Sequence, residues 1–145
     1  MFKHLLLPTD GTILSERAVH VGIELARSLG ARVTALHVIA PFQMLTYQTG
    51  MLEETRTVYE RDSLAHAGRY LDFVAKTAAE SAVACETMTE SRDDIYQSII
   101  DVARARACDL IVMASHGRRG IAGLLMGSQT QHVLTHSHTP VLVCC

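Results

Sequence analysis

The sequence predicts an α/β protein with a doubly wound parallel sheet. Short apolar runs alternate with longer segments of helical periodicity along the chain, in the order β-α-β-α-β-α-β-α-β. Several of these runs are continuously apolar, as expected for strands that are buried on both faces of a parallel sheet. With 145 residues, of which 48% are hydrophobic and 19% charged, residues 1–145 are expected to form a single domain with its own core.

The first part of the chain predicts a βαβ unit. The apolar run Phe2 to Leu7 is expected to be the first strand, followed by the turn Pro8-Thr9-Asp10-Gly11. A helix is expected to begin at Ser15 and to end at Gly30, because glycine readily adopts the left-handed conformation that ends helices. The second strand is expected from Ala31 to Ile39, with a right-handed crossover.

The middle of the chain predicts a loop, a long helix and a weaker strand. Ala40 to Leu52 follow no period and are expected to form a loop, and Glu53 to Ala79 are expected to form the helix. Its expected core-facing residues are Val58, Leu64, Leu71, Val74 and Ala78. The third strand is expected from Ala82 to Thr89. Ser91-Arg92-Asp93-Asp94 then resembles a capping box for a helix that ends near Arg106.

The stretch from Asp109 to Leu134 carries the clearest functional signal. A predicted buried strand, Leu110 to Met113, is followed by a loop with glycines at 117, 120, 123 and 127 and by a predicted helix, Ser128 to His136. Ser128 and Gln131 have the spacing of a capping box. After Thr139-Pro140, the fifth strand is expected at Val141 to Cys144.

The order strand, glycine loop, helix N-terminus is typical of phosphate sites. Glycines allow backbone N–H groups to approach an anion, and the first helical turn adds unpaired donors and a partial positive charge. The stretch contains neither G-x-G-x-x-G nor G-x-x-x-x-G-K-[ST], so neither of these phosphate-binding motifs applies. Arg118 and Arg119 can either contact phosphate or simply be solvated, and the residues alone leave both readings open.

Composition argues against several other classes. The net charge of −2 gives no general electrostatic attraction to nucleic acid or anionic membranes. No apolar run approaches the roughly 18–20 residues of a membrane span, and the first residues do not resemble a signal peptide. The four cysteines show no metal or disulfide spacing, so a cytoplasmic protein with reduced thiols is expected. His132 and His136 have a zinc-binding spacing, but without a nearby acidic or cysteine partner a surface or packing role is expected.

Three segments together resemble the universal stress protein family over essentially the whole chain: the Pro8–Gly11 turn, Leu36-His37-Val38-Ile39, and the block from Asp109 to Ser128. Nucleotide-binding members of that family carry G-x2-G-x9-G-[ST] between the fourth strand and the last helix. The matching positions here are Ala114, Gly117, Gly127 and Ser128. The spacing is therefore intact, whereas the first glycine is alanine. The family's frequent glycine after the third strand is also absent from Thr89 to Ser91.

The resemblance implies the strand order 3-2-1-4-5, with the site in the crevice between strands one and four. It also implies an adenine nucleotide, ATP with Mg²⁺, whose ribose lies near Asp10 and whose adenine edge meets the backbone of Val38. The phosphates are then surrounded by Ser115, Gly117, Gly127, Ser128 and Gln129. The expected nucleotide-binding residues are Pro8, Thr9, Asp10, Val38, Ala114, Ser115, His116, Gly117, Arg118, Gly127, Ser128 and Gln129. No side chain is singled out as a metal ligand.

The expected function is therefore that of a nucleotide-binding stress-response switch with slow hydrolysis or none. The sequence shows no Walker lysine and no nucleophile–base pair, so an enzyme is the least supported reading and a very slow ATPase the most it allows. A homodimer through Val141 to Cys144 is also expected. One alternative is a dimeric interaction protein of the same fold that binds no nucleotide. Another is a nucleic-acid-binding protein that uses the G-x-x-G of Gly117 to Gly120, although such loops join two helices in KH domains and here the loop follows a strand.

Overall fold

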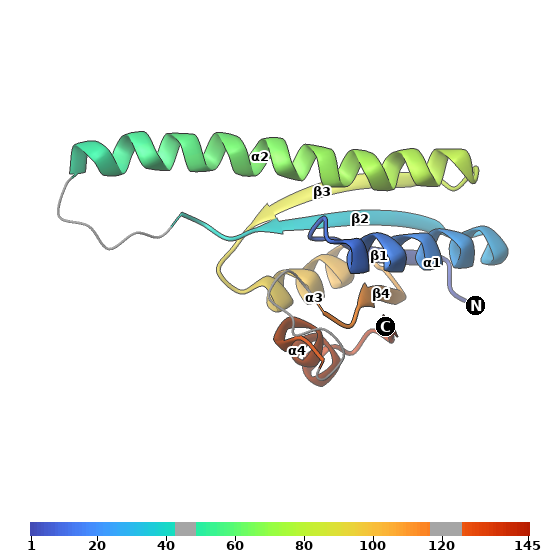
Figure 1. Ribbon diagram of the computed structural model, residues 1–145. Coiled ribbons are helices and arrows are strands. Elements are labelled where there is room, and N and C mark those ends of the chain that lie inside the picture. The colour runs from blue at the N-terminus through green and yellow to red at the C-terminus, as the bar shows by residue number, and fades with distance from the viewer. Residues whose placement is uncertain (43–48, 117–125) are drawn as a thin grey trace.

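The fold confirms the predicted doubly wound α/β class. The computed structural model describes residues 1–42, 49–116 and 126–145, and the strands form one parallel sheet in the order β3-β2-β1-β4-β5. Within these ranges the elements are β1 His4–Pro8, α1 Ile13–Leu29, β2 Arg32–Ile39, α2 Thr49–Glu80, β3 Cys85–Ser91, α3 Ile95–Ala105, β4 Leu110–Ala114, α4 Ser128–His136 and β5 Val141–Cys144 (Figure 1). The order reverses between β1 and β4, as predicted.

Helices cover both faces of the sheet, and β1 contributes to both cores. Leu5 and Leu7 pack with residues of α1 and α2, whereas Leu6 packs with residues of α3 and α4. Successive side chains of a strand point to opposite faces, so a strand covered on both sides must be apolar at every position. This burial explains why the sequence shows a continuous apolar run here rather than an alternating pattern.

The helix ends follow the prediction only in part. Gly30 ends α1 in the left-handed conformation, with φ of 65°, as predicted. The helix begins at Ile13, however, because Thr12 is its N-cap and accepts a hydrogen bond from the Ser15 N–H at 3.2 Å. The capping box predicted at Ser91 to Asp94 is wrong, since the N-cap residue Asp94 makes no side-chain capping bond.

The capping box predicted for Ser128 and Gln131 is also wrong. The N-cap of α4 is Gly127, so Ser128 is already the first helical residue. The Gln131 side-chain amide instead donates to the Met126 carbonyl at 3.3 Å. The sequence pattern marked the right region, but the chain enters helical geometry one residue earlier than a capping Ser128 requires.

α2 differs most from the prediction. It begins at Thr49, within the stretch predicted as a loop, and its first half projects past the carboxyl ends of the strands (Figure 1). Val58 and Leu64 are 45% and 63% exposed, so their predicted placement in the core is wrong. The second half lies on the sheet, and Leu71, Val74 and Ala78 are buried as predicted. Helical periodicity identified the apolar residues but not where the sheet stops.

The third strand is shifted towards the C-terminus of its predicted range. It spans Cys85–Ser91 instead of Ala82 to Thr89. Ala82 has φ of 55°, a left-handed conformation in which the chain turns after α2. The strand can therefore begin only after this turn.

Candidate functional site

A pocket of about 640 Å³ opens at the carboxyl ends of β1, β2 and β4. This is where ligands bind in open α/β sheets, next to the reversal of strand order, and the volume lies within the roughly 300–1,000 Å³ of small-molecule sites. Its lining residues come from the predicted motifs and also from α2 and α3: Pro8, Thr9, Asp10, Ser15, Leu36, His37, Val38, Ala40, Tyr59, Asp93, Ile95, Ile99, Met113, Ala114, His116, Gly127, Ser128, Gln129 and Thr130.

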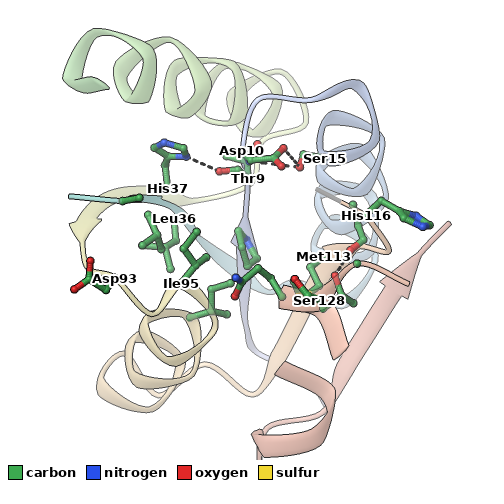
Figure 2. A pocket seen from close by; sticks show the side chains of 18 of the residues that line it. Thr9, Asp10, Ser15, Leu36, His37, Asp93, Ile95, Met113, His116 and Ser128 are labelled. Carbon is green, nitrogen blue, oxygen red and sulfur yellow. Dashed lines mark hydrogen bonds between the residues drawn. The ribbon is translucent and has the colours of Figure 1, made fainter. Parts of the chain in front are cut away.

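The two ends of the pocket differ in their share of apolar side chains. Asp10, Ser15, His116 and Ser128 gather on one side of the close-up view, the polar end (Figure 2). Leu36 and Ile95 lie on the other side, the apolar end, where His37 and Asp93 also belong to the pocket lining (Figure 2). The pocket therefore combines an aliphatic patch with polar groups on both sides.

Asp10 is held in place by the start of α1. Its Oδ1 accepts hydrogen bonds from the Thr12 N–H at 3.0 Å, the Thr12 hydroxyl at 2.6 Å and the Ser15 hydroxyl at 2.6 Å (Figure 2). Three donors on one oxygen fix the position of this carboxylate at the pocket wall. Asp10 therefore organises the turn after β1 in addition to lining the pocket.

The turn after β1 is also packed from above by α2. Gly11 has φ of 78°, and the Tyr70 ring covers it so closely that a β-carbon at this position would overlap the ring. His37 meets Tyr70 edge to face at 5.1 Å, and its Nδ1 lies 2.7 Å from the Thr9 carbonyl oxygen, so Nδ1 is the donor. Glycine is thus needed at position 11 for two reasons, its backbone conformation and the close approach of α2.

The N-terminus of α4 supplies the hydrogen-bond donors of the polar end. The first-turn N–H groups of Ser128, Gln129 and Thr130 have no partner within the helix, as at every helix N-terminus. The Gly127 N–H, in contrast, donates to the Ser115 carbonyl at 2.7 Å. The donors that can meet an anion are therefore those after Gly127, where the helix dipole also favours negative charge.

The predicted residues near α4 have different structural roles. The Gln129 side-chain oxygen accepts from the Tyr96 N–H at 3.0 Å and so joins α4 to the start of α3. Ser115 is only 5% exposed, is not among the lining residues, and has its hydroxyl 2.9 Å from His116 Nδ1. Ala114 lines the pocket, and its carbonyl accepts from the Thr130 hydroxyl at 2.8 Å. The predicted Gly117 and Arg118 lie outside the described residues.

The pocket lining includes residues that sequence reasoning missed. Val38 was predicted, but Leu36, Ile95, Ile99 and Tyr59 also line the pocket. Tyr59 was missed because α2 was expected to turn Val58 towards the core. A usable signal exists in the sequence, since Tyr59, His66 and Tyr70 are seven and four residues apart and therefore lie on one stripe of the helix.

Metal and membrane signals are absent from the described part of the chain. In residues 1–42, 49–116 and 126–145, no three His, Cys, Asp or Glu side chains are grouped so that they could hold a metal ion. The His132 ring stacks on Tyr96 at a centroid distance of 4.7 Å, and the tilted His136 ring lies 5.3 Å from Tyr96. No helix in these ranges is both long enough and apolar enough to cross a membrane.

A parallel sheet with the order 3-2-1-4-5 and a pocket at the reversal of strand order define a doubly wound α/β protein. The sequence profile of the universal stress protein family matches residues 1–144, and the chain belongs to this family. The chain is 31% identical to universal stress protein MJ0531 of Methanocaldococcus jannaschii, and the match covers 99% of this chain and 82% of that protein.

Solved structures share the fold. That of MJ0577 from a structural genomics study gives a TM-score of 0.78 at 24% identity, covering 99% of this chain and 95% of the other. A universal stress protein in complex with cAMP gives 0.72 at 22% identity, with coverages of 99% and 96%. A family protein from Arabidopsis thaliana with AMP bound gives 0.68 at 17% identity, with coverages of 97% and 90%. At these identities the likeness concerns the fold alone.

Proposed function

We propose that this protein binds an adenine nucleotide, in the first place Mg-ATP, and acts as a stress-response switch. The observation that carries the proposal is that the pocket combines the first-turn N–H groups of α4, which have no partner within the helix, with an aliphatic patch that includes Leu36, Val38 and Ile95. A nucleotide has the matching parts, with anionic phosphates and an uncharged planar base. Two proteins of the same fold have cAMP and AMP bound, which supports this choice of ligand class.

In this proposal each predicted segment has one task. The phosphates meet the first-turn N–H groups of Ser128 and Gln129, where the helix dipole favours negative charge. The ribose lies beside Asp10, and the base occupies the end lined by Leu36, Val38 and Ile95. Mg²⁺ accompanies the phosphates of ATP and keeps mostly phosphate and water oxygens as ligands.

Hydrolysis is proposed to be slow or absent. The chain has no Walker lysine, and Asp10, the carboxylate beside the polar end, already accepts three hydrogen bonds through one oxygen. A switch needs binding and a change in the protein, not turnover. Phosphate release well below one per second is expected from pure protein.

We further propose a cytoplasmic homodimer of single-domain chains that pair through β5. β5 is at one edge of the sheet, where unpaired backbone groups are open to another strand. Leu142 in this strand is 39% exposed. Pairing of two β5 strands about a two-fold axis joins identical surfaces and covers both edges.

A thermal-shift panel tests the ligand class directly. Mg-ATP, AMP, cAMP, GTP and a short RNA are each added to the purified protein. A nucleotide present at 100 times its Kd adds about 2.7 kcal/mol of stability, or a rise of several degrees for a chain of this size. Adenine nucleotides are expected to raise the melting temperature more than GTP. No rise with any nucleotide would favour the dimeric interaction protein, and a rise with RNA alone would favour nucleic-acid binding.

A further inference from the structure

The apolar end of the pocket has a wall that comes from α2. Tyr59 lines the pocket, and its hydroxyl donates to the Ala40 carbonyl at 2.6 Å. Ala40 follows β2 directly and also lines the pocket. The Phe42 ring lies 5.3 Å from the Tyr59 ring, and the Arg56 guanidinium lies 5.9 Å from the centre of the Phe42 ring. Tyr59 and Arg56 thus hold α2 against the segment that forms the pocket rim.

Tyr59 belongs to the stripe of α2 that faces the site. Tyr70 on the same stripe covers Gly11 and meets His37, and His66 stacks with Tyr70 at 6.1 Å. Side chains eleven residues apart differ by about 20° around a helix, so Tyr59 and Tyr70 point the same way. α2 therefore contacts the site at both ends, at the turn that carries Asp10 and at the apolar rim.

The contacts of Tyr59 matter because the surrounding half of α2 projects beyond the sheet (Figure 1). From Glu53 to His66 every side chain is exposed except those of Tyr59 and Ser63. Arg56 and Tyr59 connect this half to Ala40 and Phe42 through a cation–π contact, a ring contact and a hydrogen bond. The position of the projecting half thus depends on the rim of the pocket.

We propose that Tyr59 is a ligand-contacting residue whose ring forms a wall for the base of the bound nucleotide, so that binding fixes the projecting half of α2. The inference rests on the proposed function. An anionic group drawn to the α4 N-terminus leaves the uncharged planar part of the ligand at the apolar end, beside Tyr59. A flat heterocycle gains from an aromatic neighbour there. Residues 53–62 are then the part of the protein whose order depends on occupancy.

The test compares Tyr59→Ala, Tyr59→Phe and, as a control on the exposed side of the same helix turn, Glu60→Ala. Affinities for AMP and for ribose 5-phosphate, which lacks the base, are measured by calorimetry. Tyr59→Ala is expected to weaken AMP about tenfold, the effect of one aromatic contact, and to leave ribose 5-phosphate within about twofold. Glu60→Ala is expected to bind both ligands like the parent.

Hydrogen exchange of residues 53–62 provides the second readout. AMP is expected to slow exchange there in the parent and not in Tyr59→Ala. Without ligand, Tyr59→Phe is expected to exchange faster than the parent, because the bond to the Ala40 carbonyl is lost.

Four results would overturn the inference in whole or in part. Unchanged AMP affinity in Tyr59→Ala would show that Tyr59 does not contact the base. Equal losses of affinity for AMP and for ribose 5-phosphate would show that the substitution damages the pocket as a whole and not a base contact. Identical hydrogen exchange of residues 53–62 in the ligand-free parent and in Tyr59→Phe would show that the bond from the Tyr59 hydroxyl to the Ala40 carbonyl does not anchor α2. A parent that binds neither AMP nor Mg-ATP refutes both the proposed function and the base contact, whereas the ligand-free exchange still decides the anchoring role.

Discussion

Replacing Gly11 with alanine tests the packing of α2 on the Asp10 turn. The substitution forces a β-carbon residue into a left-handed conformation at φ of 78°, which costs about 1–2 kcal/mol. The new β-carbon also overlaps the Tyr70 ring inside 3.0 Å, so the ring or the turn must move. Overpacking of this kind costs about 1–3 kcal/mol. The total is about 3 kcal/mol, or a fall of about 10 °C in melting temperature.

The assay is a double-mutant cycle in denaturant unfolding. Gly11→Ala is measured in the parent and in a Tyr70→Ala background, where the ring is absent and only the backbone cost should remain. The expected difference between the two backgrounds is about 1–3 kcal/mol. The matched control is Gly68→Ala, because Gly68 lies in α2 with open space around it. It should stabilise the protein by about 0.5–1 kcal/mol. The same cost for Gly11→Ala in both backgrounds would refute the Tyr70 contact.

Three further predictions concern α4, the buried end of β1 and the sheet edge. Ser128→Ala should change the unfolding free energy by less than about 0.5 kcal/mol, because Gly127 and not Ser128 is the N-cap. The same substitution should weaken Mg-ATP binding about five- to tenfold, the effect of losing one hydrogen bond from the Ser128 hydroxyl. A loss of about 1 kcal/mol of stability would instead mean that Ser128 caps α4. Burial holds the pKa of His4 below its usual value, so the unfolded chain binds a proton more readily than the folded chain does. The parent should therefore lose stability as the pH falls below about 6.5, by up to about 1.4 kcal/mol per pH unit. His4→Gln should show a shallower dependence between pH 7.5 and 5.5, and equal slopes would contradict this. Leu142→Lys should give a monomer in light scattering, whereas an unchanged dimer would place the interface elsewhere.

The strands were the most predictable part of the fold, because a strand buried on both faces is apolar at consecutive positions. Leu5, Leu6 and Leu7 are apolar since β1 is covered on both faces. The Pro8–Gly11 turn and the region around Ser128 could be located for a related reason, since glycine and proline mark where strands and helices end. Family resemblance then supplied the strand order, which the structure confirms.

The remaining features depend on contacts between distant parts of the chain. Val58 and Leu64 fit a helical stripe but are exposed, and a local pattern cannot show how far a sheet extends. Tyr59 could not be assigned to the pocket without knowing that α2 passes the end of β2, where its hydroxyl meets the Ala40 carbonyl. The two capping boxes failed because side-chain spacing does not determine which residue first adopts helical geometry.

The central claim is that an adenine nucleotide binds with its phosphates at the α4 N-terminus and its base at the Val38 end. A titration of the ¹⁵N-labelled protein with AMP, followed through its amide resonances, tests this most directly. The account predicts saturable shifts that are largest at Ser128 and Gln129 and at Val38. An AMP titration without saturable shifts, or with shifts confined to the opposite end of the sheet around His4, would contradict it.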